Sequence, residues 1–148
     1  MKGVVYFIVC GDLGRVKIGF TRGSPMKRLK SLQTGSPCKL MLMAFYTAPP
    51  DEERRLHREF DKFRVSGEWF EMDDEIFDFI VCTVILECLR GIRDRGEPPK
   101  WANAVIQKLK NDGILDQYLE VINEHIADDN SLAAKPIALG QDGVAGSC

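Results

Sequence analysis

Hydrophobic and polar positions alternate most clearly at the start of the chain. A run of β-branched and aromatic residues spans 4–10, and a second run spans 15–21. The residues between them, 11–14, carry the Gly and Asp of a hairpin turn. A third run spans 39–47 and stops before two prolines. This pattern predicts three β-strands, the first two of which form an antiparallel hairpin.

Between and after these runs, apolar positions recur at helical spacing. Ser24 is the expected N-cap and Pro25 the first residue of a helix that ends at Gly35. Asp51 begins a second helix, and residues 67–71 form a short extended segment. Further helices are predicted over 75–93, 101–111 and 114–126.

These elements define an α+β fold. We expect a small three-stranded antiparallel sheet flanked by helices, with a C-terminal helical extension. The length of 148 residues suits one ordinary hydrophobic core. We assign residues 1–93 to the main domain and 94–127 to the helical extension. Residues 128–148, where Ala, Gly, Asp and Ser dominate, are predicted to form a flexible tail.

The net charge of the chain hides a strong asymmetry. Its 20 Lys and Arg residues nearly balance its 22 Asp and Glu residues, and the net charge is -2. Residues 1–63, however, hold 12 basic and 6 acidic residues, whereas residues 64–148 hold 8 and 16. The first half therefore has the charge expected of a surface that binds a polyanion such as DNA.

Cysteine and histidine are too sparse and too scattered for a zinc site. The five cysteines form no CxxC pair, and the chain has two histidines. No basic segment followed by an apolar one marks a secretory signal at the N-terminus, and the apolar stretch 76–89 contains two acids. We expect a cytoplasmic protein with free thiols and no membrane partner.

Four ordered blocks within the first 75 residues carry candidate chemistry. They are Val4-Val5-Tyr6 with KIGFT at 17–21, RLKSLQTGSP at 28–37, ERRLHREF at 53–60 and GEWF at 67–70. This pattern resembles the GIY-YIG nuclease superfamily, and in particular its phage-type branch, in which KIG replaces YIG. The resemblance covers about half of the chain. It implies a metal-dependent endonuclease that hydrolyses phosphodiester bonds in DNA with one Mg²⁺ or Mn²⁺ ion.

The resemblance assigns proton transfer to the hairpin and to the second helix. Tyr6 matches the tyrosine of the first tripeptide, and Lys17 takes the place of the second tyrosine. A phenol is a weak base unless cations lower its pKa, a role that Lys17 can fill. His57 is a further candidate for orienting water or relaying a proton. The alternative for Tyr6 is a half-buried tyrosine that packs on the sheet.

Phosphate contacts are expected from the first helix. Arg28 matches the arginine of the family, whose planar guanidinium can hold a phosphate through two hydrogen bonds. Lys27, Lys30 and Arg22 are candidates for further nucleic-acid contacts. A solvated helix face is the alternative interpretation of these charges.

Glu53 matches the metal-binding glutamate of the family, since one carboxylate suits a Mg²⁺ ion that also binds substrate phosphate. Glu52 competes for this role, and an acid in the first turn of a helix is more often only a partner of the helix dipole. Glu68 is expected to support a catalytic group or to cap a turn. The proline-tyrosine-asparagine element of many members is absent, and the GEWF block stands in its place.

Two other functions stay open. The same scaffold could bind nucleic acid without cleaving it, using the basic hairpin and helix for phosphates. Alternatively, the acidic C-terminal half could hold a protein partner or a second copy in a homodimer, since residues 99–126 are neutral to acidic. The residues alone do not indicate whether DNA or RNA is preferred, or which sequence is recognised. Convergence of the candidate residues on one face would favour the nuclease.

Overall fold

A computed structural model describes residues 1–128, and it begins with the predicted hairpin. β1 (Gly3–Cys10) pairs antiparallel with β2 (Arg15–Thr21), and the 3-10 turn η1 (Gly11–Leu13) joins them. Gly14 closes the turn with φ 60°, a left-handed conformation that glycine adopts at little cost. The predicted tail lies, from residue 129 on, outside the described residues.

The sheet is open and has five antiparallel strands, so the prediction of three strands was wrong in number. β3 (Leu40–Ala48) lies beside β1, and the strand order is β3-β1-β2-β5-β4. The two additional strands are β4 (Arg64–Ser66) and β5 (Trp69–Glu71). Three residues are too few to show a period of two, and β4 has no buried residue. These strands form through the turn at Gly67, which has φ 56°.

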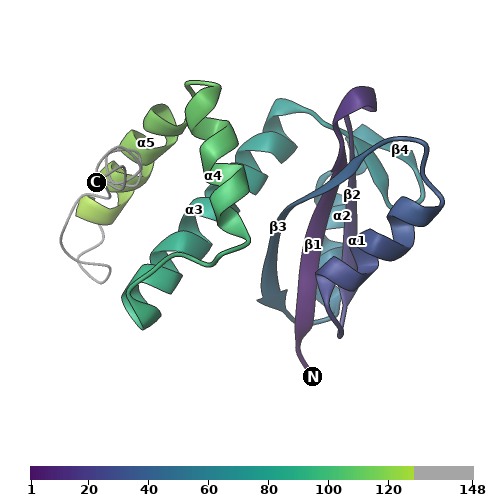
Figure 1. Cartoon of the computed structure of the whole chain (residues 1–148), viewed down its shortest axis with the longest axis horizontal. Coiled ribbons are helices and arrows are strands. Elements are labelled where there is room, and N and C mark those ends of the chain that lie inside the picture. Colours follow the sequence, from purple (N-terminus) through teal and green to yellow (C-terminus); the bar gives the residue numbers. More distant parts are fainter. Residues whose placement is uncertain (129–148) are drawn as a thin grey trace.

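The helices cover both faces of the sheet (Figure 1). Ser24 caps α1 as predicted, because its side chain accepts a hydrogen bond from the Lys27 backbone N–H. α1 packs on one face, whereas α2 and α3 pack on the other. The helices are α1 (Pro25–Thr34), α2 (Asp51–Glu59), α3 (Asp74–Arg95), α4 (Ala102–Asn111) and α5 (Leu115–Asp128), with the 3-10 turn η2 (Asp61–Phe63) after α2.

Alternation along β1 and β2 divides the apolar residues between two cores. Val5, Phe7 and Ile18 point to the face covered by α2 and α3. Tyr6 and Ile8 point to the opposite face, where Leu29 and Leu32 of α1 cover them together with Cys10, Leu40 and Leu42. The position of a residue along either strand therefore decides whether its side chain faces α1 or faces α2 and α3.

The C-terminal helices share the larger core. Val105, Leu109 and Leu115 are buried in the same cluster as the sheet residues. Trp101 also packs on Phe45 of β3, with 4.7 Å between ring centroids and 35° between the ring planes. Helices α4 and α5 are thus packed against the sheet domain through α3 and β3 (Figure 1). Within the described part of the chain, no helix is both long enough and apolar enough to cross a bilayer.

Candidate functional site

The candidate residues meet at one edge of β2. β5 pairs with β2 only at Arg15, Val16 and Lys17. The next residue, Ile18, donates its N–H to the Glu68 carbonyl at 3.0 Å and accepts a hydrogen bond at its own carbonyl from His57. Among the described residues, β2 has no strand partner on this side from Ile18 onward. Side chains from both faces of the sheet therefore meet at this edge.

Lys17 is a buried lysine with one acidic partner. Its side chain projects to the face covered by α1, and only 8% of the residue is exposed. The ammonium group forms an ion pair with Glu68, which lies in the turn between β4 and β5. A lysine this deeply buried needs a counter-charge. Glu68 thus fixes Lys17 at the edge of the sheet.

Tyr6 lies on the same face and packs against the backbone of β2. It is 1% exposed and stands opposite Gly19 in the β1–β2 ladder. A Cβ at Gly19 would lie within 3.0 Å of the Tyr6 ring and hydroxyl. The glycine of the KIG block therefore makes room for the Tyr6 phenol. Tyr6 is more deeply buried than the half-buried tyrosine considered from the sequence.

Arg28 of α1 is the cation that acts on the Tyr6 hydroxyl. Burial raises the pKa of Tyr6 above its usual value, whereas the neighbouring Arg28 guanidinium lowers it. The negative charges of Glu68 and Glu53 raise the pKa of Tyr6 further. Arg28 is thus a cation that acts on this pKa, whereas the Lys17 ammonium is paired with Glu68; that Lys17 also lowers the pKa of Tyr6 stays a prediction.

Glu53 reaches the same cluster from α2, on the other side of the sheet. Its pKa is raised, first by burial and then by the charge of Glu68, while His57 and Lys17 oppose this rise. One carboxylate oxygen of Glu53 lies 3.9 Å from Nε2 of His57, one helical turn further along α2. Glu53 and Glu68 are thus two neighbouring carboxylates, with Lys17 and His57 beside them.

His57 is held by the backbone of β2. Its Nε2 lies 2.9 Å from the Ile18 carbonyl oxygen, and its ring packs at 5.2 Å from the Phe70 ring. A carbonyl can only accept, so Nε2 carries the proton of this hydrogen bond. A neutral His57 therefore has its lone pair on Nδ1.

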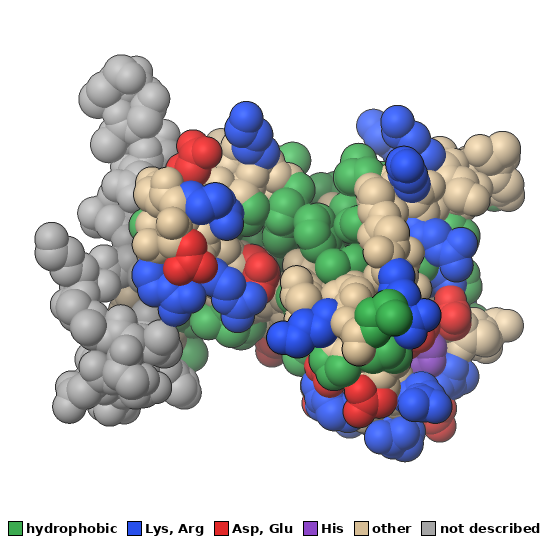
Figure 2. All heavy atoms as spheres, turned by 90° about the horizontal axis from the view of Figure 1, so that it is seen from below, with side chains coloured by type: hydrophobic (Ala, Val, Ile, Leu, Met, Phe, Trp, Pro, Cys, Tyr) green, Lys and Arg blue, Asp and Glu red, His purple; other side chains and the backbone are tan. Residues whose placement is uncertain are grey.

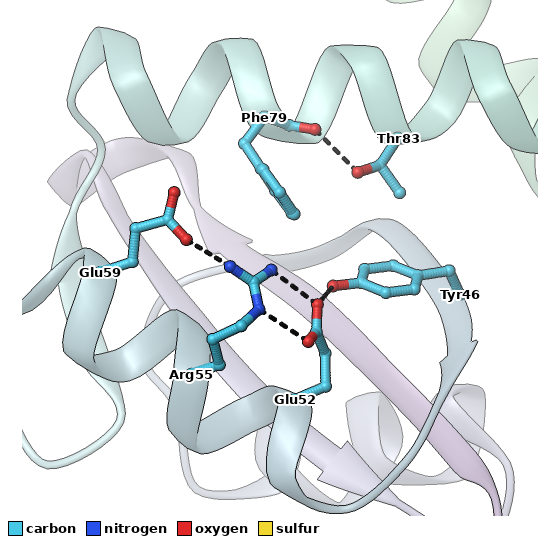
Figure 3. Close-up of polar contacts among 6 residues, drawn as sticks. All are labelled: Tyr46, Glu52, Arg55, Glu59, Phe79 and Thr83. Carbon is cyan, nitrogen blue, oxygen red and sulfur yellow. Dashed lines mark hydrogen bonds and ion pairs between the residues drawn. The ribbon is translucent and has the colours of Figure 1, made fainter.

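Glu52 is excluded from the cluster by its own partners (Figure 3). Arg55 donates from Nε to one carboxylate oxygen and from Nη2 to the other, both at 2.8 Å, and the Tyr46 hydroxyl donates at 2.7 Å. This bidentate pairing lowers the pKa of Glu52, chiefly through Arg55. Of the two adjacent glutamates, only Glu53 faces Lys17, His57 and Glu68.

The other basic residues predicted to bind nucleic acid are exposed. Lys27 and Lys30 are i, i+3 neighbours on α1, and Arg22 precedes this helix. Lys30 is two positions from Arg28, so the two side chains leave the helix in different directions. Figure 2 shows lysine and arginine side chains around the histidine on the part of the molecule that contains the sheet, with acidic side chains between them.

Arg64 is a contributor that the sequence interpretation missed. Its guanidinium donates to the Gly67 carbonyl and, at 3.3 Å, to the His57 carbonyl. It also lies over the Phe70 ring, 4.9 Å from the centroid. Arg64 thus ties the turn that carries Glu68 to the end of α2. No sequence signal reveals this role, because the contacts depend on the two short strands.

The fold and the site define a small α+β domain with a cluster of charged side chains and a buried tyrosine at an open sheet edge. The chain belongs to the T5orf172 domain family, whose model matches residues 3–93. No curated protein and no solved structure gave a significant match. Family membership indicates a nuclease-like or nucleic-acid-binding module, with DNA as the partner it suggests.

Proposed function

We propose that this protein is a metal-dependent endonuclease of the GIY-YIG superfamily that hydrolyses phosphodiester bonds in DNA. The observation that supports this most strongly is the meeting of Tyr6, Lys17, Glu53 and His57 with Arg28 at one edge of β2. These residues come from β1, β2, α1 and α2, and the sequence separates them by up to 51 positions. A purely structural role for each of them does not require that they meet.

The donor set suits a small divalent cation. Mg²⁺ is commonly bound by one or two carboxylates, with water and substrate phosphate completing its six ligands. Glu53 would hold the ion, and Glu68 is the neighbouring carboxylate. No group of three or more His, Cys, Asp or Glu that could hold a metal occurs among the described residues. When bound, Mg²⁺ or Mn²⁺ neutralises charge on the scissile phosphate and activates water.

The remaining side chains have separable roles. Arg28, exposed on α1, holds the phosphate and stabilises the charge that develops on it. Tyr6 starts as a neutral phenol because burial raises its pKa. A cation beside Glu53 and Glu68 would offset the two negative charges that raise the pKa of Tyr6. This would favour Tyr6 as the base. His57 is the other candidate base, through Nδ1.

A binding module without catalysis is the second candidate. The exposed Lys27, Lys30 and Arg22 favour it, since phosphate contacts alone give affinity for any nucleic acid. The four described cysteines, Cys10, Cys38, Cys82 and Cys88, are free thiols, which suits the reducing cytoplasm that we propose as the location in either case.

Nicking of supercoiled plasmid DNA with Mg²⁺ or Mn²⁺ tests the proposal. We expect Glu53→Ala and Arg28→Ala to lower the nicking rate by about 100-fold or more, as loss of a charge-stabilising group does in other active sites. Glu53→Ala should largely keep its affinity for DNA. Glu59→Ala is the matched control, because Glu59 lies on the same helix and pairs only with Arg55 among the ion pairs described.

The outcomes separate the two functions. Nicking that depends on the divalent ion and on Glu53 supports the endonuclease. DNA binding without cleavage, across several metals and substrates, overturns it in favour of the binding module. Equal loss of nicking in the Glu59→Ala control would show that the effect of Glu53 is structural.

A further inference from the structure

A pocket of about 310 Å³ lies on the α1 side of the sheet, next to the candidate site. The turn between β1 and β2, the loop from α1 to β3, and the β4–β5 hairpin contribute its walls. Figure 1 shows these segments at one end of the sheet. The volume falls at the lower end of the range for small-molecule sites, about 300–1,000 Å³. The pocket thus has room for one small planar group.

The walls of the pocket are apolar, with an indole among them. Trp69 lines it together with Cys10, Leu40 and Pro37. Trp69 is partly buried, so one part of its surface packs on the core while another part lines the pocket. Indole surfaces stack well on flat aromatic ligands, nucleobases among them.

The same pocket is lined by a partly exposed guanidinium. Arg15 lines it, and Nη2 of Arg15 forms an ion pair with Glu71 at 3.2 Å. Nε of Arg15 is buried and has no hydrogen-bond partner. A guanidinium has five N–H donors, and the exposed part of Arg15 can donate to an acceptor atom of a ligand in the pocket. The base edge of a nucleotide presents such acceptors.

The pocket and the candidate site are next to each other along two strands. Trp69 follows Glu68 and stands opposite Lys17 in the β2–β5 ladder. Arg15 lies on the same face of β2 as Lys17, two residues away, which is about 6.6 Å along a strand. A strand with one phosphate at Arg28 and Lys17 can therefore place a nearby base in the pocket.

We propose that this pocket binds one unstacked nucleobase of the strand that is cleaved. This inference rests on the proposed function and narrows its substrate class. A base reaches the pocket only when it is outside a base-paired stack, so the substrate has an unpaired base beside the scissile phosphate, as in single strands, flaps or loops. Phosphate contacts from α1 attract the strand, and the pocket selects for the unpaired base.

Fluorescence of Trp69 tests the proposal in the full chain. Trp101→Phe leaves Trp69 as the only tryptophan and keeps an aromatic ring against Phe45. This variant is titrated, in EDTA to prevent cleavage, with a thymidine oligonucleotide and with an abasic oligonucleotide of the same length. Fluorescence anisotropy of a label on each oligonucleotide reports total binding. The abasic strand has the phosphates without the bases.

We expect the thymidine strand to quench Trp69 and to bind about fivefold or more tightly than the abasic strand, as loss of one stacked base does elsewhere. Arg15→Lys should reduce this difference and keep binding of the abasic strand. Arg93→Lys, at an exposed arginine that also has an acidic partner, is the control and should change neither.

Three results overturn the inference and are distinguishable from one another. Equal binding and equal quenching by both strands would show phosphate recognition without a base pocket, and the proposed endonuclease would still stand. Absence of binding by either strand at low salt would overturn the pocket, and the plasmid-nicking assay would then decide separately whether the proposed endonuclease stands. Stronger binding of a fully paired duplex than of the thymidine strand would exclude an unpaired base as the occupant.

Discussion

Tyr6 and Gly19 face each other in the β1–β2 ladder, and the phenol ring of Tyr6 occupies the space that a side chain at position 19 would need. Tyr6 is also covered by α1, which carries Arg28. The position of the Tyr6 hydroxyl is therefore set by a glycine on one side and by a helix on the other. The tripeptide that ends in Tyr6 and the tripeptide that ends in Gly19 therefore pack as one unit.

Gly19→Ala is predicted to displace Tyr6. The added Cβ overlaps the ring, so we expect a loss of about 1–3 kcal/mol in the free energy of unfolding, as other overpacked cores show. Nicking should fall more than stability alone explains, because the hydroxyl moves relative to Arg28. Gly11→Ala is the control, since no atom lies within 4 Å of its Cβ position. Urea denaturation and plasmid nicking measure both effects, and unchanged nicking by Gly19→Ala would contradict this packing role.

Glu53 is predicted to make stability depend on pH. Its pKa is raised in the folded protein above the ordinary 4.5, so the folded state binds more protons than the unfolded state in that range. The free energy of unfolding therefore falls as pH rises from about 4.5 through the raised pKa. Glu53→Gln should be more stable than the wild type at neutral pH, and this gain should vanish below the ordinary pKa.

Thermal unfolding at several pH values measures this gain. Glu59→Gln serves as the control, because Glu59 lies on the surface of the same helix and such substitutions change stability by only about 0.5 kcal/mol. A divalent ion should reverse the order of the two proteins if Glu53 binds it. A stability difference that does not vary with pH would contradict the prediction.

Lys27 and Lys30 are predicted to affect affinity without affecting chemistry. Each phosphate contact contributes about 0.9 to the slope of log K against log salt on duplex DNA. Lys27→Ala and Lys30→Ala should each reduce the slope by about 1 and leave the nicking rate at saturating DNA unchanged. Lys108→Ala on α4, where the lysine pairs with Asp112, is the control. An unchanged slope would place the phosphates elsewhere.

Leu109 links the C-terminal helices to the stability of the site. It is buried in the same cluster as the sheet residues Val5 and Phe7. Leu109→Ala should lower the free energy of unfolding by about 2–5 kcal/mol in a single transition. Exposed Leu86 on α3 provides the matched control, Leu86→Ala. Two separate transitions, followed by circular dichroism and by tryptophan fluorescence, would show instead that α4 and α5 unfold independently.

Local patterns predict the large elements of this fold. The hairpin, the cap at Ser24 and the α+β class follow from alternation, turn residues and helix signals. The strands β4 and β5 do not, because each has three residues and their pairing depends on the turn at Gly67. The packing of α4 and α5 on the main core also escapes local patterns, since it depends on long-range contacts such as that between Trp101 and Phe45.

The candidate site could be predicted as a set of residues but not as an arrangement. Family blocks identify Tyr6, Arg28 and Glu53, and the structure brings them to one edge. The choice between Glu52 and Glu53 requires three dimensions, because adjacent helical residues point about 100° apart and Glu52 meets Tyr46 and Arg55. The role of Arg64 also requires three dimensions, because its contacts reach both the turn at Gly67 and the end of α2 at His57.

The three-residue length of β5 also determines how much of the β2 edge is left uncovered for a substrate. Each further residue paired with β2 would extend the ladder by about 3.3 Å and would cover the edge where Lys17, Glu53 and His57 meet. Insertions that lengthen β5 should therefore enlarge the sheet and block access of a substrate to the candidate site. A natural or designed relative with a longer strand here would keep the fold but have its candidate site covered.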